Sequence, residues 1–174
     1  MKINVLISQE EIAAKVKELA ATINEDYQGK SIVLLGTLTG SVMLLTDLMR
    51  ELTLDVQVDF IKVSSYGAGT QSTRTIKEEY LPTWDIADRH VLVIEDIIDT
   101  GHTAAYLLKY LADKNTASVE MCTLLDKPSR REVSDLNCKY VGFTIEDKFV
   151  VGYGLDYNQK YRQLPYIGVV EGGL

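Results

Sequence analysis

An apolar run followed by acids and a small polar loop carries the clearest chemical signal in this sequence. The run at residues 91–94 is followed by Glu95, Asp96 and Asp99, and then by Thr-Gly-His-Thr at residues 100–103. This order is typical of a buried strand, a loop at its carboxyl end and a helix. Ligands of open α/β sheets bind at such strand ends, and a glycine-containing loop that opens a helix offers backbone N–H groups to a phosphate. Adjacent carboxylates can hold the hydroxyl groups of a sugar, directly or through Mg²⁺, so the stretch predicts a phosphate site beside a polyol or metal site.

Each piece of this stretch, taken alone, has an ordinary structural explanation. Acids after a strand are often loop residues, and Thr-Gly-His-Thr is compatible with a turn and a helix N-cap. Short motifs of this kind often match by chance, so neither piece alone favours a functional site. The complete string is more informative than its pieces because of the resemblance described below.

Composition places the chain among ordinary globular proteins. Its 174 residues are 46% hydrophobic and 25% charged, which predicts one domain spanning residues 1–174 with a sizeable core. The net charge of −7 argues against a dedicated nucleic-acid binder. No apolar run is long enough to span a membrane, and the first residues do not have the pattern of a secretory signal. We therefore expect a cytoplasmic protein with no membrane association.

Cysteine and histidine are too sparse to build several common kinds of site. Cys122 and Cys138 match no zinc-binding spacing and are too few for a disulfide framework. His90 and His102 are the only histidines, which argues against a His-based metal site or a Ser-His-Asp triad. We expect a reducing environment and no structural metal.

The spacing of apolar residues predicts alternating strands and helices. Ser8 and Glu11 form a capping-box pattern ahead of a helix that Gly29 closes. The apolar residues expected on one face of this helix are Ile12, Val16, Leu19, Ala20 and Ile23. Further helices are predicted over 42–52 and 104–111, and strands over 2–7, 32–35, 54–60, 91–94, 119–125, 140–145, 149–151 and 166–170.

Two polar segments interrupt this alternation. Residues 64–79 are rich in Gly, Ser and Thr and predict a mobile loop, and residues 127–137 predict a charged loop. The alternation itself predicts an α/β fold with a parallel sheet and helices on both of its faces. The terminal segments do not fit the alternation, so we expect them to pack as a small lobe over the carboxyl edge of the sheet.

The string at 91–103 resembles the phosphoribosyl-pyrophosphate (PRPP) signature of the type I phosphoribosyltransferases. The resemblance extends from Ile32 to Val170, and four further segments narrow it to the hypoxanthine-guanine phosphoribosyltransferases. It implies that Glu95 and Asp96 bind the ribose hydroxyls and Mg²⁺. Asp99 lies between these acids and the phosphate loop, so we predict that it is the general base that accepts the purine N7 proton. The residues implied to hold the 5′-phosphate are Thr100, Gly101, His102 and Thr103.

Two of the further segments resemble the family's pyrophosphate site. In the loop at 38–41, Thr39 and Gly40 are implied to hold pyrophosphate through backbone N–H groups, often with a non-proline cis peptide. The family usually has Lys or Arg where this chain has Thr39, so no side-chain charge is expected there. Asp156 is implied to bind a Mg²⁺ that carries pyrophosphate, and Arg162 to contact the pyrophosphate directly. Without the other motifs, the loop would be interpreted as a plain turn into a helix.

The remaining matches concern the purine and a flap over the site. Lys127 is implied to donate to the purine 6-oxo group, Phe149 to stack on the ring, and the Val150 backbone to bind the edge of the base. Ser65 and Tyr66 are implied to lead a flexible flap that excludes water. Alone, Lys127 would be an ordinary surface charge, Phe149 a core or interface residue and the flap a solvated hairpin.

Together these matches imply an enzyme of purine salvage that uses Mg²⁺. PRPP and hypoxanthine or guanine would give IMP or GMP and pyrophosphate, in a homodimer or homotetramer. One alternative is a regulator on the same fold that binds nucleic acid, which the acidic net charge argues against. Another is a related transferase for xanthine or a pyrimidine; the sequence does not rank guanine, hypoxanthine and xanthine.

Overall fold

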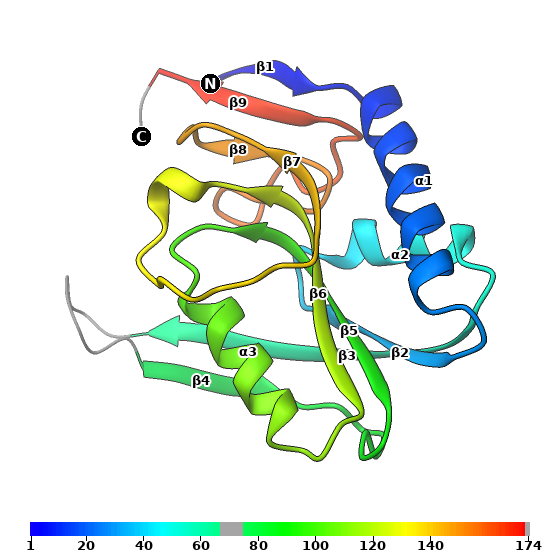
Figure 1. Ribbon diagram of the computed structural model, residues 1–174. Coiled ribbons are helices and arrows are strands. Elements are labelled where there is room, and N and C mark those ends of the chain that lie inside the picture. Colours follow the sequence, from blue (N-terminus) through cyan, green and yellow to red (C-terminus); the bar gives the residue numbers. More distant parts are fainter. Residues whose placement is uncertain (67–74, 173–174) are drawn as a thin grey trace.

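A six-stranded sheet forms the centre of the molecule (Figure 1). The computed structural model describes residues 1–66 and 75–172. All strand pairs in this sheet are parallel except the edge pair β3–β4. In spatial order the strands are β4 (Thr75–Tyr80), β3 (Asp55–Tyr66), β2 (Ser31–Thr37), β5 (His90–Ile98), β6 (Ser118–Asp126) and β7 (Tyr140–Thr144).

Helices cover both faces of this sheet, as the alternation predicted. Side chains of α1 (Gln9–Asp26) and α2 (Val42–Glu51) share one core cluster with Leu34 and Leu92, and α3 (His102–Ala112) shares a second cluster with Val33 and Val93. The alternation arises because successive residues of a strand point to opposite faces. Each fully buried aliphatic side chain contributes about 1.5–3 kcal/mol to folding, so both faces of β2 and β5 hold the helices in place.

Helix α1 begins as the capping-box pattern predicted. The Ser8 hydroxyl accepts a hydrogen bond from the Glu11 backbone N–H at 3.1 Å, and the Glu11 carboxylate accepts one from the Ser8 N–H at 3.1 Å. The five residues predicted for its apolar face are the five buried residues of this helix. Local sequence therefore determines both the start and the orientation of α1.

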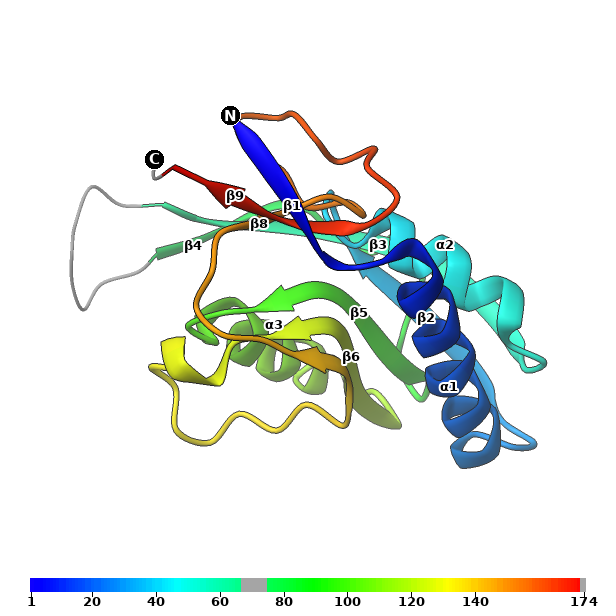
Figure 2. The same ribbon diagram turned by 90° about the horizontal axis from the view of Figure 1, so that it is seen from above.

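A second, antiparallel sheet forms a hood over the carboxyl edge of the central sheet (Figure 2). The predicted lobe of terminal segments is confirmed, because β1 (Lys2–Ile7) and β9 (Ile167–Glu171) pair with each other, and β9 also pairs with β8 (Val150–Val151). The Tyr153 hydroxyl donates to Asp47 Oδ2 at 2.6 Å and ties the hood to α2. The chain therefore folds back across its own strand ends.

Two predicted boundaries are wrong. Strand β5 continues through Ile98 because β6 pairs with it as far as Asp126, so Glu95 and Asp96 lie within a strand and not in a loop. The predicted loop at 64–79 has strand at both ends, because β3 reaches Tyr66 and pairs with β4 from Thr75. The rest of that loop, residues 67–74, lies outside the described residues.

A short 3₁₀ helix, η1 (Pro128–Arg130), lies inside the predicted charged loop after β6. Its proline is at one of the first helical positions, where a missing N–H costs nothing. In the described part of the chain, no helix is both long and apolar enough to cross a membrane.

Candidate active site

The predicted site residues converge at the carboxyl ends of β2, β5 and β6, beneath the hood. Parallel pairing of these neighbouring strands brings their following loops to one edge of the sheet. The hood supplies the opposite wall, because an ideal Cβ built on Gly154 would lie 2.1 Å from the Gly40 carbonyl oxygen. Backbone from the hood and from the loop after β2 is therefore in direct contact.

The acidic pair on β5 is largely withdrawn from solvent. Glu95 is 7% exposed, and the Thr37 hydroxyl donates to its carboxylate. Burial raises the pKa of Glu95, and the negative charge of Asp96 raises it further. Burial also raises the pKa of Asp96, against the opposing effect of the Ile97 N–H, which donates to Asp96 Oδ1 at 2.7 Å. Two acids with raised pKa values at a strand end are typical of a functional site.

The loop after β2 packs directly on Asp96. An ideal Cβ on Gly40 would lie 1.7 Å from Asp96 Oδ2, so only glycine leaves room for this carboxylate. The Leu38–Thr39 peptide bond is cis, as the resemblance implied, and Thr39 itself is exposed. Ser41 anchors the end of the loop, with its hydroxyl donating to the Thr37 carbonyl at 2.6 Å.

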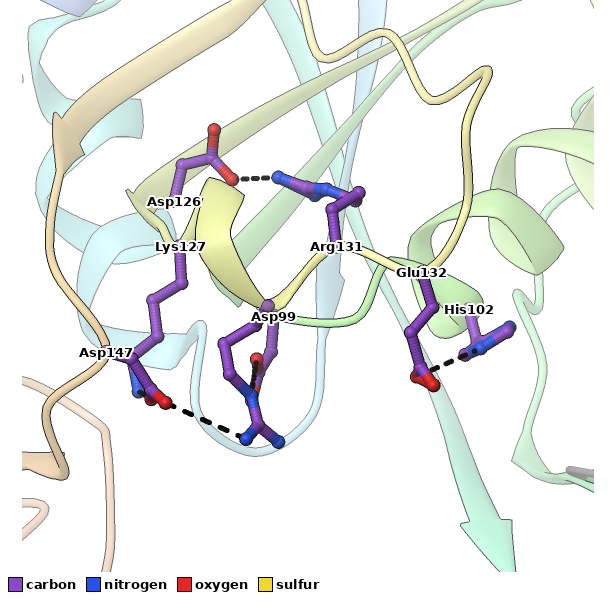
Figure 3. A network of polar contacts seen from close by, with 8 residues as sticks. Asp99, His102, Asp126, Lys127, Arg131, Glu132 and Asp147 are labelled. Atoms are coloured by element: carbon purple, nitrogen blue, oxygen red, sulfur yellow. Dashed lines mark hydrogen bonds and ion pairs between the residues drawn. The ribbon is translucent and has the colours of Figure 1, made fainter. Parts of the chain in front are cut away.

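A cavity of about 140 Å³ lies between Glu95, Asp99 and the predicted phosphate loop. Gly101 stands at the N-cap of α3 with φ of +93°, and its backbone carbonyl accepts from the Ala105 N–H at 2.9 Å. His102 Nε2 lies 3.4 Å from Glu132 Oε2, at one side of this loop (Figure 3). The residues that line the cavity are Glu95, Ile97, Ile98, Asp99, Thr100, Gly101, Thr103 and Ala104.

Asp99 has a partner that the sequence did not indicate. Arg130 Nε donates to Asp99 Oδ1 at 3.0 Å, and Arg130 Nη1 lies 3.7 Å from Asp147 Oδ2. The other oxygen of that carboxylate, Asp147 Oδ1, lies 3.7 Å from Lys127 Nζ. Figure 3 shows Asp99, Lys127 and Asp147 gathered at this end of the sheet. Neither Arg130 nor Asp147 was predicted, and only their charge in a polar loop could have drawn attention to them.

Lys127 is unusual because its ammonium group is held in a largely buried position. The side chain is 9% exposed, although lysine is rarely buried without a partner. Its backbone N–H donates to the Ile98 carbonyl at 2.9 Å, which places it beside the end of β5. Lys127 is therefore not an ordinary exposed surface lysine.

The hood brings the aromatic and basic candidates to the opposite side of the site. Phe149 is 39% exposed and meets the Tyr157 ring edge-on, with 5.6 Å between the ring centroids. Arg162 Nη1 donates to the Gly154 carbonyl at 2.6 Å, and Arg162 Nη2 lies 3.5 Å from Asp156 Oδ1. The positive charge of Arg162 lowers the pKa of Asp96 and the negative charge of Asp156 raises it, both less than burial does.

The predicted metal ligands are Glu95, Asp96 and Asp156. Within residues 1–66 and 75–172, no group of three or more His, Cys, Asp or Glu side chains is arranged to hold a metal ion. Mg²⁺ usually keeps several waters and takes one or two carboxylates together with substrate phosphates. Asp96 and Asp156 offer such hard oxygen donors, so the residues fit an ion that arrives with a phosphorylated substrate.

Ser65 and Tyr66 occupy the last positions of β3. Their backbones pair with Ile76 and Thr75 of β4, so both belong to an antiparallel strand pair at the edge of the sheet. The segment they were predicted to lead, residues 67–74, lies outside the described residues.

Comparisons with known proteins agree over nearly the whole chain. The phosphoribosyl transferase domain family matches residues 6–158. The hypoxanthine phosphoribosyltransferase of Salmonella typhimurium is 47% identical over 170 residues, covering 97% of this chain and 95% of that protein. The hypoxanthine-guanine phosphoribosyltransferase of Streptococcus pneumoniae is 46% identical over 167 residues, covering 96% and 92%. Among solved structures, a hypoxanthine-guanine phosphoribosyltransferase from Bacillus anthracis superposes with a TM-score of 0.93 at 45% identity, covering 97% of this chain and 99% of that one.

Proposed function

The chain belongs to the phosphoribosyltransferase family, among its hypoxanthine-guanine members, and we propose that it transfers the 5-phosphoribosyl group of PRPP to hypoxanthine or guanine. The products are IMP or GMP and pyrophosphate, which makes it an enzyme of purine salvage. One observation carries the assignment: a single cavity is bordered by Glu95, Asp99 and the loop that opens α3. A sugar site, a proton acceptor and a phosphate site therefore adjoin one another.

The ribose is held from two sides in this proposal. The loop at residues 100–103 binds the 5′-phosphate through its backbone N–H groups at the start of α3, while Glu95 and Asp96 bind the ribose hydroxyls. Positive charge develops at C1′ as pyrophosphate leaves, and the carboxyl oxygens of Glu95 and Asp96 stabilise it. Glu95 and Asp96 therefore both orient the ribose and stabilise the positive charge at C1′.

The purine is bound between the end of β5 and the hood. Lys127 donates a hydrogen bond to the 6-oxo group, Phe149 stacks on the ring, and the Val150 backbone contacts the edge of the base. Asp99 accepts the proton that N7 loses as the purine attacks C1′. Phe149 is 39% exposed, which leaves part of its ring free to contact a purine.

Pyrophosphate leaves toward the loop at 38–41 and the hood. Arg162 presents a permanently charged planar fork, and the backbone around Thr39 and Gly40 supplies N–H groups. Mg²⁺ bound with the substrate, near Asp96 and Asp156, would neutralise part of the phosphate charge. Assembly into a homodimer or homotetramer stays a prediction from the family resemblance.

The proposed function predicts a clear preference for 6-oxopurines. With PRPP and Mg²⁺, hypoxanthine or guanine should react about 10²-fold faster than adenine, because the adenine amino group has no free acceptor for the Lys127 ammonium. The measurement is the absorbance change on nucleotide formation with each base in turn, repeated without Mg²⁺.

Variants test the role of Lys127 in that preference. Lys127→Met should reduce the discrimination against adenine, whereas Lys139→Met, which removes an exposed lysine that faces Asp26, should leave it unchanged. Adenine as the best substrate of the wild-type enzyme would remove Lys127 from the assigned role. Tight binding of nucleic acid without any transferase activity would instead favour the alternative function, a regulator that binds nucleic acid.

Neutralising the acidic pair tests the ribose site. The double substitution Glu95→Gln and Asp96→Asn should raise KM for PRPP by about 10- to 100-fold, because each carboxylate accepts charge-assisted hydrogen bonds. KM for the purine should change much less, since the base is bound by other residues. Unchanged steady-state constants for PRPP would exclude the pair from the site.

The same double variant has a second expected phenotype, in stability. Burial raises the pKa of both acids in the folded protein, so the folded protein keeps protons that the unfolded chain releases. The contribution of this pair to wild-type stability should therefore fall as pH rises from about 4, the ordinary pKa of such acids, through their raised pKa values. The double variant lacks this loss and should melt at a higher temperature than wild type at pH 8, with the gap closing near pH 4. A gap that stays constant between these pH values contradicts the electrostatic explanation.

A further inference from the structure

Alternating charges connect the acid at the end of β5 with the buried lysine at the end of β6. Asp99 accepts from Arg130, Arg130 faces one oxygen of Asp147, and the other oxygen of Asp147 faces Lys127. Figure 3 shows dashed contacts from Asp99 and from Asp147 that meet at one guanidinium group. The order is negative, positive, negative, positive, so each neighbour attracts the next.

The two ends of this series must act on neighbouring atoms of one ligand. A 6-oxopurine presents N7 and O6 on the same edge of the ring. In the proposed function Asp99 takes the N7 proton and Lys127 donates to O6, yet the two residues come from different strands. Their backbones are adjacent because the Lys127 N–H donates to the Ile98 carbonyl. This backbone contact does not fix the positions of the two side chains relative to each other, so side-chain contacts must do so.

Arg130 has the geometry for that connection. Its Nε binds one oxygen of Asp99, at 3.0 Å, and leaves the second oxygen as an acceptor for the purine proton. Its Nη1 points to Asp147, 3.7 Å away, which in turn lies 3.7 Å from the Lys127 ammonium. A guanidinium can do this because its donors diverge from a rigid plane, whereas an ammonium offers a single centre of charge.

We propose that Arg130 is a positioning residue for the transfer reaction, which fixes Asp99 and, through Asp147, Lys127 at the spacing that N7 and O6 require. This inference rests on the proposed function. Arg130 touches no reacting atom in this arrangement. It acts through the two residues that do.

The exposure of this network separates a positioning role from a structural one. The side chains of Arg130, Asp99 and Asp147 are 48%, 43% and 53% exposed. Exposed ion pairs add little to folding stability, so removing Arg130 should leave the fold and the melting temperature nearly unchanged. Any large effect on the reaction then reports on geometry in the site.

The first experiment is Arg130→Gln, measured in steady state with each substrate varied. The ratio kcat/KM for hypoxanthine should fall by about 10- to 100-fold, the range expected for a displaced reacting group, and KM for PRPP should not change. Arg130→Lys restores the charge without the fork and should recover part of the loss. Arg50→Gln removes an arginine that is 72% exposed and paired within α2, and it should leave both constants unchanged.

The second experiment asks whether Arg130 acts through Asp99. If it does, adding Arg130→Gln to Asp99→Asn should cost little more than Asp99→Asn alone. In wild type, the Arg130 Nε–H signal in a ¹⁵N NMR spectrum should be slow to exchange, and it should shift in Asp99→Asn. Combined with the loss in the first experiment, the small extra cost supports the positioning role, because an arginine that acted independently of Asp99 would add its full cost. The NMR shift shows that the contact between Arg130 and Asp99 is present in solution.

Several results would overturn this inference. An active wild-type enzyme whose Arg130→Gln variant keeps its purine constants rejects the role of Arg130 and leaves the proposed function intact. If Arg130→Gln raises only KM for PRPP, or if its effect adds fully to that of Asp99→Asn, Arg130 does not act by positioning Asp99. A wild-type protein that forms no nucleotide rejects the proposed function and with it the role of Arg130, whatever the NMR spectrum shows.

Discussion

Replacing Asp99 with asparagine should lower kcat by about 10²- to 10⁴-fold, the range for a positioned general acid or base. Asparagine keeps the shape of the side chain and can still accept a hydrogen bond from Arg130, but it cannot take the N7 proton. PRPP binding should largely survive, because Glu95 and Asp96 on β5 and the loop that opens α3 remain. The loss should therefore appear in the chemical step and not in KM for PRPP.

Single-turnover chemistry at saturating substrates is the decisive measurement, with a thermal melt to confirm folding. An alternative role for Asp99, as a cap of the following helix, does not agree with the structure. The N-cap of α3 is Gly101, and no side chain caps it. Asp113→Asn, at the opposite end of α3, is a matched control and should leave the rate unchanged. A folded Asp99→Asn enzyme with a near wild-type single-turnover rate would end the assignment of Asp99 as the base.

Replacing Gly154 with alanine should destabilise the protein by about 2–6 kcal/mol and weaken PRPP use. Gly154 has φ of +99°, and an ideal Cβ there would lie 2.1 Å from the Gly40 carbonyl oxygen. Left-handed backbone and overpacking each cost about 1–3 kcal/mol. The Gly154 carbonyl also accepts from Arg162, so moving this backbone displaces the guanidinium assigned to pyrophosphate. The added methyl group would force the hood and the loop at 38–41 apart where they touch.

A second glycine separates these two costs. Gly29 has φ of +78°, but an ideal Cβ there meets no atom within 4 Å. Gly29→Ala should therefore show only the backbone cost, about 1–3 kcal/mol, with normal kinetic constants. Urea unfolding of both variants, together with KM for PRPP, tests the argument. Equal destabilisation by the two substitutions would mean that the hood moves aside and that overpacking at Gly154 costs nothing.

Elements with strong local signals could be predicted from the sequence. The capping box at Ser8 and the apolar spacing that follows it determine α1 without reference to the rest of the chain. The carboxyl-edge site followed from the order of strand, acids and loop, and the structure places Glu95, Asp99 and Gly101 around one cavity. Here local preference and tertiary structure agree, which is the condition under which such predictions succeed.

The features that were missed depend on partners far away in the sequence. Residues 95–98 look like the start of a loop because two of them are acids, yet pairing with β6 makes them strand. Residues 64–66 and 75–79 look like parts of a loop because the segment 64–79 is polar and rich in Gly, Ser and Thr, yet they pair with each other. Arg130 meets Asp99 and Asp147 only after three separate segments have folded together. No periodicity within a single segment could have revealed these contacts.

The hood makes the order of synthesis matter for this fold. Strand β1 precedes every other element, but its partner β9 follows all of them. While the ribosome is still making the chain, the segment that becomes β1 has no partner strand, and unpaired backbone groups of this kind can associate with other chains. The segment with Asp156 and Arg162 lies between β8 and β9, so it too waits for the same closing event. The central sheet can form earlier, and the site becomes complete only when the last strand docks beside the first.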